Sequence, residues 1–172
     1  MSAERRQRTK RRIAVRNLHP CLRLDRRAVV GALRALDENH AALAAPASTL
    51  DNAHELSLVF LTDGELAALH DRFLADPSAT DVITFAGRPA LGLAGEICVS
   101  ADAAARYAAA RGGDLSDELT LYIAHGWLHL AGHDDRQPRP RRAMRRAEAR
   151  ALGLLRAAGA MPRFSLVQRG SR

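Results

Sequence analysis

Cysteine, lysine and aromatic residues are scarce in this sequence of 172 residues. Its two cysteines, Cys21 and Cys98, are too few for a disulfide framework in a chain of this length. No apolar run approaches the roughly 20 residues that a membrane-spanning helix needs, and the charged N-terminus is not followed by the apolar core of a secretory signal. We therefore expect a cytoplasmic protein without a membrane partner.

Lysine occurs once, at Lys10, so arginine supplies nearly all of the positive charge. The formal net charge is +7, but the charges are sorted by position: residues 1–36 carry +9, residues 37–135 carry −12 and residues 136–172 carry +10. Coding bias explains a preference for arginine over lysine, whereas it does not explain this sorting. We expect the two basic ends to contact a polyanion and the acidic middle to bind a cation.

Apolar periodicity and turn residues predict strands that alternate with helices. Asp25 and Ser116 are the expected N-caps of two helices, Thr62 and Glu65 form a capping box, and Gly132 ends the helix that precedes it. We expect strands at 12–18, 55–61, 80–85 and 95–100, and helices at 25–44, 62–73, 100–112, 116–131 and from about 140 to 158. The fold class is then α+β, a single domain with a mixed sheet of about four strands packed with helices.

The composition divides the chain into three parts. Residues 1–12 are strongly basic and almost without apolar side chains, which is typical of a disordered arm. Residues 13–158 contain all the periodic segments and form the expected domain. Residues 159–172 lack a pattern and are expected to be a basic tail.

The run HGWLHLAGHDD at 125–135 concentrates the residues that carry chemistry. His125 and His129 lie one turn apart on one face of the expected helix. Because Gly132 ends that helix, the chain can fold back and bring Asp135 toward both imidazoles. Two nitrogens and one carboxylate oxygen suit zinc, and three protein ligands leave the fourth position open for the water of a catalytic site. The run predicts a hydrolase with one divalent metal ion, preferably Zn²⁺, at the C-terminal end of a central helix.

Two histidines four residues apart are a weak signal by themselves, and the residues next to them leave the identity of the third ligand open. His133 replaces Asp135 as ligand if the aspartate instead caps the turn. Asp134 is expected to orient one of the histidines through a hydrogen bond, which ligand histidines usually need. Gly126 stands where HExxH metallopeptidases have their catalytic glutamate, and this argues against a peptidase. Trp127, between the ligand histidines but on another face, is expected in the core.

The same run resembles the signature HGxLHLxGxDH of the rRNA maturation RNase YbeY family. TDVITF at 80–85 is similar to the family's TDVLSF segment, and GEICVS at 95–100 is similar to its GDIxIS segment. The resemblance extends from about residue 55 to residue 155. The matching residues are His125, Gly126, Leu128, His129, Leu130, Gly132 and Asp134 in the signature, Glu118 and Leu119 before it, and Met144 and Glu148 after it.

This resemblance implies a metal-dependent, single-strand-specific endoribonuclease that matures the 3′ end of small-subunit ribosomal RNA and acts in ribosome quality control. It implies His125 and His129 as the first two zinc ligands and places Asp135 where the family normally has a histidine. The family often has an arginine before the TDV segment, at a position that is Leu74 here. Arg72, the nearest arginine, is a candidate catalytic residue only because it lies two residues before this position.

The expected partners are a ribosomal RNA precursor and the ribosome or its small subunit, with no DNA expected. Aromatic residues make up 4% of the chain, which leaves little for base stacking, so we expect backbone-led binding with weak sequence selectivity. Two other functions stay open. One is a ribosome-assembly factor whose metal is mainly structural, and the other is a different metal hydrolase such as a peptidase.

Overall fold

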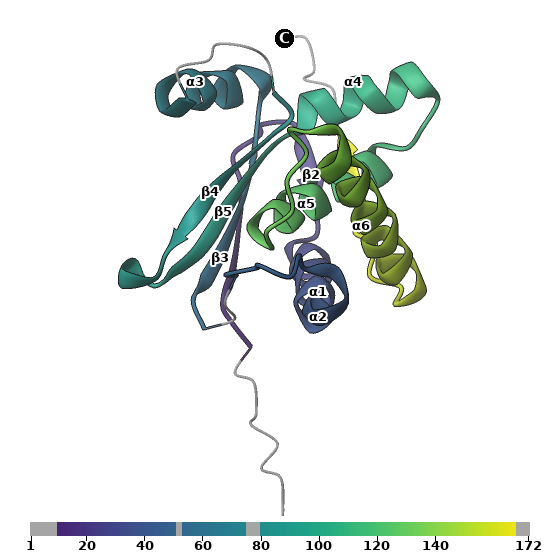
Figure 1. Ribbon diagram of the computed structural model, residues 1–172. Helices are drawn as coiled ribbons and strands as arrows, with labels where there is room; N and C mark the ends of the chain where they lie inside the picture. The colour runs from purple at the N-terminus through teal and green to yellow at the C-terminus, as the bar shows by residue number, and fades with distance from the viewer. Residues whose placement is uncertain (1–9, 51–52, 75–79, 168–172) are drawn as a thin grey trace, which may run out of the picture.

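The computed structural model describes residues 10–50, 53–74 and 80–167, with Leu74 described in its backbone only. Strands and helices are interspersed along this part of the chain (Figure 1). The strands are β1 (Ile13–Asn17), β2 (Leu22–Leu24), β3 (Glu55–Leu61), β4 (Val82–Arg88), β5 (Leu93–Ser100) and β6 (Phe164–Leu166). The helices are α1 (Arg26–Glu38), α2 (His40–Leu43), α3 (Asp63–Leu74), α4 (Ala101–Arg111), α5 (Leu115–Leu130) and α6 (Pro138–Ala157), and a 3₁₀ turn, η1 (Pro89–Leu91), joins β4 to β5. Helices α4, α5 and α6 follow one another without a strand between them.

Four strands form a mixed sheet in the order β1-β3-β5-β4. Strand β3 pairs in parallel with both β1 and β5, whereas β4 pairs antiparallel with β5. Strands β2 and β6 form a separate antiparallel pair. The expected α+β class and mixed sheet of about four strands are confirmed.

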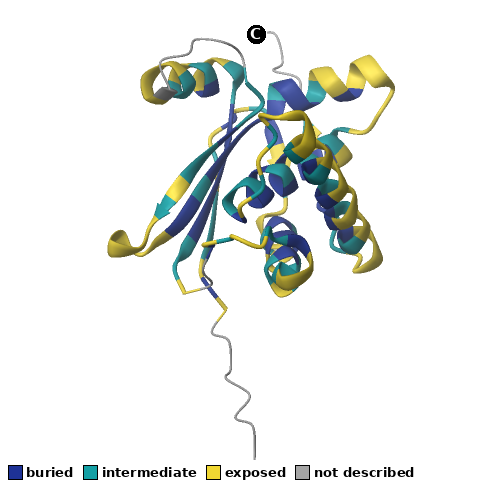
Figure 2. Ribbon diagram, in the orientation of Figure 1, coloured by how far each residue is buried: buried dark blue, intermediate teal, exposed yellow. Residues whose placement is uncertain are grey.

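The residues of β3 alternate between the two faces of the sheet, as a period of two requires. Leu58 and Phe60 belong to the main core, which also contains the buried face of α5. Val59 and Leu61 belong to a smaller cluster that contains Leu66 of α3. Helices α5 and α3 therefore cover opposite faces of the sheet, and Figure 2 shows the dark-blue buried residues that line the strands between them.

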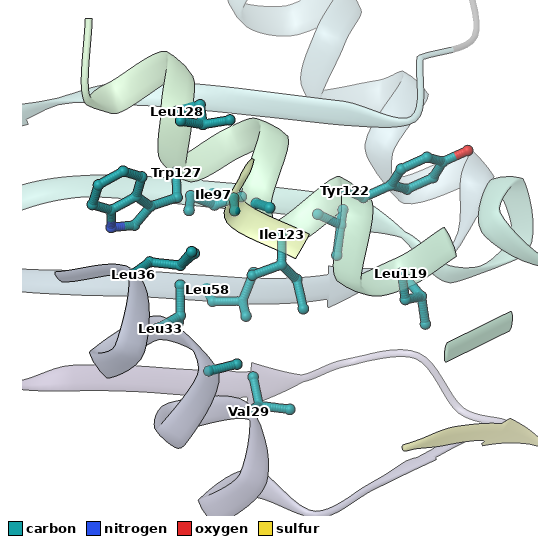
Figure 3. Packing of buried hydrophobic residues seen from close by; sticks show 14 of the residues in the cluster. Val29, Leu33, Leu36, Leu58, Ile97, Leu119, Tyr122, Ile123, Trp127 and Leu128 are labelled. Carbon is teal, nitrogen blue, oxygen red and sulfur yellow. The ribbon is translucent and has the colours of Figure 1, made fainter. Parts of the chain in front are cut away.

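Helix α5 lies against β5 at Gly126. A Cβ atom at this position would come within 2.4 Å of Cγ2 of Ile97 on β5, so only glycine permits this approach. Trp127, the next residue, is fully buried, as expected, and its Nε1 donates to Oδ1 of Asp37 on α1 at 2.9 Å. Figure 3 shows Trp127 packed with Leu36 of α1 and Ile97 of β5 in the main core.

The end of the predicted basic arm is part of the fold. Residues 1–9 lie outside the described residues, but Arg11 is 4% exposed. Its guanidinium forms an ion pair with Asp37, the acceptor of the Trp127 hydrogen bond. The side chains of Lys10 and Arg12 are exposed, so Arg11 alone of residues 10–12 is buried, beside the fixed counter-charge that a buried arginine needs.

Three further details differ from the expectation. The helix expected over 25–44 ends at Asn39, whose side chain donates to the Ala35 carbonyl, and a separate short helix follows. Asp114, not Ser116, caps α5, since its carboxylate accepts from two amides of the first turn. Ser116 is buried and its hydroxyl accepts from the Phe164 amide of β6. Residues 164–166 are thus a strand, although they were assigned to the unpatterned tail.

The N-terminal cap at Asp25 and the capping box of Thr62 and Glu65 are confirmed by their hydrogen bonds. Within the described residues, no helix is both long and apolar enough to cross a membrane.

Candidate metal centre

Two histidines project from one face of α5. The Nε2 atoms of His125 and His129 lie 2.9 Å apart, and the two rings meet edge to face with their centroids 4.4 Å apart. This geometry follows from a spacing of four residues on a helix. Both side chains are about one-quarter exposed, so the pair is open to solvent on one side.

Asp135 completes the group because α5 ends as the sequence predicts. Gly132 has φ +90°, in the left-handed region, and the amide of His133 bonds back to the carbonyl of Leu128. After this reversal, carboxylate oxygens of Asp135 lie 3.6 Å from Nε2 of His125 and 3.7 Å from Nε2 of His129. The three ligand atoms lie within 4.8 Å of one another, and such a group could hold a metal ion.

The other ring nitrogens of the two histidines are held by separate elements. Nδ1 of His125 lies 2.7 Å from Oε1 of Glu148 on α6. Nδ1 of His129 lies 3.1 Å from the carbonyl oxygen of His133. Since a carboxylate and a carbonyl only accept hydrogen bonds, both Nδ1 atoms are the donors and carry the proton in the neutral rings.

The positions of these protons decide whether the residues fit a metal ion. With both Nδ1 atoms protonated, the Nε2 atoms of His125 and His129 turn unshared electron pairs toward each other at 2.9 Å. The carboxylate of Asp135 adds a third acceptor to the same space. Three converging acceptors repel one another unless a cation or a proton lies between them, and two imidazoles with one carboxylate are a donor set that zinc accepts.

The electrostatic environment shifts the pKa values of the two histidines in opposite directions. Burial lowers the pKa of His125, but the hydrogen bond and negative charge of Glu148 outweigh burial, and the net pKa is raised. The pKa of His129 is lowered, first by burial and then by the neighbouring His125. His129 therefore stays neutral to lower pH than His125 does.

His133 and Asp134, the other polar residues of the turn, both make contacts outside the group of three. His133 directs Nε2 to the carbonyl oxygen of Leu43 at 2.7 Å, and so its side chain ties the turn to α2. The carboxylate of Asp134 accepts from the amides of Asp135 and Arg136. The expectation that Asp134 orients a histidine is wrong, because Glu148 and the carbonyl of His133 hold the two Nδ1 atoms.

Glu148 and Arg141 of α6 contribute to the site without being predicted from the spacing. Glu148 orients His125, and the only sequence signal for it was its match to the family's last helix. Nε of Arg141 donates to the backbone carbonyl of Asp135 at 3.0 Å and thereby fixes the turn. Both contacts join the loop and α5 to α6.

Arg72 is not brought to this group. It is exposed on α3, the helix whose Leu66 packs on the sheet face opposite α5, and its guanidinium stacks over Phe73 at 5.4 Å from the ring centroid. The side chain of Leu74 lies outside the described residues.

Comparison with known proteins identifies the family. The model of the family described as endoribonuclease YbeY matches residues 26–156, from α1 to the end of α6. The chain belongs to the endoribonuclease YbeY family. Endoribonuclease YbeY of Chlamydia abortus is 38% identical over 112 residues, which cover 59% of this chain and 70% of the relative. That of Anaeromyxobacter dehalogenans is 41% identical over 110 residues, which cover 60% and 57%.

One solved structure has a similar fold. The solution structure of TM1509 from Thermotoga maritima superimposes with a TM-score of 0.55 and 18% identity, covering 93% of this chain and 99% of that one. Membership of the YbeY family supports a nuclease role for the chain.

Proposed function

We propose that the protein is a metal-dependent endoribonuclease that cleaves single-stranded RNA, and that it acts in 3′-end maturation of small-subunit ribosomal RNA and in ribosome quality control. The observation that carries this proposal is the convergence of His125, His129 and Asp135 into a group open to solvent, in a chain of the YbeY family. The cytoplasmic location and the association with the ribosome or its small subunit stay predictions.

The proposed metal is Zn²⁺, held by His125, His129 and Asp135. When bound, such an ion polarises a phosphodiester group and supplies hydroxide near neutral pH. Glu148 and the carbonyl of His133 hold the two imidazoles in the orientation that presents Nε2. Arg141 holds the backbone of Asp135, so the third ligand is positioned by α6 as well.

The proposed RNA contacts are made by arginines of α6. Arg142, Arg145 and Arg146 are exposed on this helix, and Figure 2 shows much of its outer face in yellow. Met144 and Glu148, on the inner face, contribute to the core and to the orientation of His125. Phosphates along the strand would bind these arginines through their charge, whereas the cleaved phosphate would lie at the group of His125, His129 and Asp135.

A peptidase fits this site poorly. The glutamate of an HExxH motif would stand at position 126, where even a Cβ atom would overlap the side chain of Ile97. Glu148 reaches His125, but its Oε1 is occupied by Nδ1 of that ring. A ribosome-assembly factor with a structural metal differs from an enzyme in that it should unfold when the metal is chelated.

The test compares cleavage of a single-stranded RNA by the zinc-loaded wild type, His129→Ala and a control, His70→Ala on α3. We expect His129→Ala to abolish cleavage while its circular dichroism spectrum stays that of the wild type, and His70→Ala to cleave normally. Chelation should stop cleavage without unfolding the protein. Unfolding on chelation would instead indicate a structural metal, and undiminished cleavage by His129→Ala would refute the proposal.

A further inference from the structure

A pocket of about 190 Å³ lies beside the candidate metal group. It is smaller than the roughly 300–1,000 Å³ of sites for drug-sized ligands, and so it suits a single flat ring. Its lining consists of Asp81, Val82, Tyr107, Glu118, Leu121, Tyr122, His125 and Glu148.

One stripe of α5 builds both the pocket and the metal group. Glu118, Tyr122 and His125 follow one another at intervals of four and three residues, which places them on one helix face. His129 continues the same stripe. Because His125 lines the pocket and also belongs to the metal group, a ligand in the pocket lies directly beside the position of the metal.

Tyr122 presents its hydroxyl group to this space, beside the carboxylate of Glu118. The residue is 5% exposed, and within the described residues its hydroxyl group has no hydrogen-bond partner. Burial raises the pKa of the phenol, and the carboxylates of Asp81 and Glu118 raise it further. In Figure 3 the ring of Tyr122 extends away from Ile123 and Leu119, with its oxygen at the far end. A buried hydroxyl without a close protein partner is costly, so an acceptor atom of a ligand in the pocket would be favoured at this position.

The other residues that line the pocket indicate the chemistry of its ligand. Asp81 and Glu118 supply carboxylate oxygens, which accept hydrogen bonds from N–H groups and repel phosphate. Val82 and Leu121 supply apolar surface, and Tyr107 supplies an exposed aromatic ring at the edge of the pocket. The ligand therefore has a flat apolar face, at least one N–H donor group and an adjacent acceptor for the Tyr122 hydroxyl.

We propose that this pocket binds one nucleobase that carries an exocyclic amino group, next to the phosphate that is cleaved. Cytosine, adenine and guanine offer an amino donor beside a ring acceptor or carbonyl, and carboxylates are known partners of the cytosine amino group. Uracil has no amino group. Unstacked bases of single strands are recognised by such combinations of aromatic stacking and hydrogen bonds. The pocket adds the choice of one base to an otherwise backbone-led interaction, and this inference rests on the proposed ribonuclease function.

The experiment uses the zinc-loaded full chain and two single-stranded RNAs of equal length, one of cytidine and one of uridine. We expect the wild type to cleave the cytidine strand about tenfold faster, the scale of one well-placed base contact. Glu118→Gln and Tyr122→Phe keep the shape of the pocket and should bring the ratio of the two rates close to one. Asp117→Asn removes a neighbouring, exposed charge of α5 outside the pocket and should leave the ratio unchanged.

Calorimetric titration with cytidine 5′-monophosphate and uridine 5′-monophosphate separates this inference from the proposed function. Tighter binding of the cytidine compound, lost in Glu118→Gln, supports the pocket even if no RNA is cleaved. Cleavage of RNA with equal rates on both strands overturns the inference and leaves the proposed function standing. A preference that survives in both pocket variants also overturns it. The inference fails as well if Mg²⁺ or Mn²⁺ binds to the zinc-loaded protein and Glu118→Gln removes that binding, because the pocket is then a cation site.

Discussion

The Oε1 atom of Glu148 on α6 lies 2.7 Å from the Nδ1 atom of His125 on α5. Helix α6 contributes no residue to the three-residue group, yet this contact determines which ring nitrogen of His125 faces His129 and Asp135. The metal centre is thus a product of packing between two helices as well as of the local spacing on α5.

Removing this contact should weaken metal binding. We expect Glu148→Ala to bind Zn²⁺ about 10–100-fold more weakly than the wild type, the usual cost of losing the partner of a ligand histidine. Competition with a zinc-binding indicator measures the change. Asp117→Ala, which removes an exposed carboxylate of α5, is the control and should bind zinc normally. Equal affinities of Glu148→Ala and the control would show that the contact does not orient a ligand.

The same contact predicts how zinc affinity depends on pH. The net pKa of His125 is raised above 6.5 because the hydrogen bond and charge of Glu148 outweigh burial. Since a protonated imidazole cannot bind a metal, zinc affinity should fall as pH falls through this raised pKa. In Glu148→Gln the pKa of His125 should be lower, so the fall in affinity should begin at a more acidic pH. Identical pH profiles of the wild type and Glu148→Gln would contradict this explanation.

The ion pair between Arg11 and Asp37 should contribute strongly to stability. The two side chains are 1% and 13% exposed, and Asp37 also accepts from Trp127. Asp37→Ala leaves a buried guanidinium without this counter-charge, so we expect unfolding in urea to require about 3–5 kcal/mol less. The neighbouring Glu38 pairs with Lys10 at the surface, and Glu38→Ala should cost at most about 1 kcal/mol. Similar losses of unfolding free energy in both variants would show that the buried ion pair of Asp37 contributes no more than a surface pair.

The arginines of α6 should determine how RNA binding depends on salt. Replacement of Arg142, Arg145 and Arg146 by glutamine should reduce the slope of log affinity against log salt by about 2, if each arginine neutralises one phosphate of a single strand. Arg88→Gln, an exposed arginine at the end of β4, serves as the control. Binding of a single-stranded RNA is measured by fluorescence anisotropy between low and physiological salt. An unchanged slope in the triple variant would place the RNA elsewhere.

Local signals predicted most of the scaffold correctly. The strand at 55–61 and the capping box of Thr62 and Glu65 depend on a few consecutive residues, and the structure has both. Gly132 reverses the chain after α5 for the same reason, since its φ of +90° suits glycine. The spacing therefore predicted that His125 and His129 converge, but it left Asp135 and His133 as alternatives for the third position, where the structure has Asp135.

Features that depend on distant parts of the chain were not predictable in this way. Glu148 meets His125 across 23 residues, and the three-residue strands β2 and β6 exist because they pair with each other. Asp134 has the side chain that a histidine partner needs, but its Oδ1 atom accepts from two amides of the turn, and the Nδ1 atoms of both histidines have other partners. Asp114, two residues before Ser116, is the cap because the helix begins at Leu115, and its carboxylate accepts from the amides of Ser116 and Asp117.

The most direct test of the metal centre is the zinc content of three purified proteins: the wild type, Asp135→Ala and His133→Ala. We expect about one ion per chain in the wild type and in His133→Ala, because His133 bonds to the Leu43 carbonyl and not to the metal. We expect a large loss of zinc in Asp135→Ala, whose missing carboxylate is the third donor. Full zinc occupancy in Asp135→Ala, or its loss in His133→Ala alone, would contradict the site of His125, His129 and Asp135.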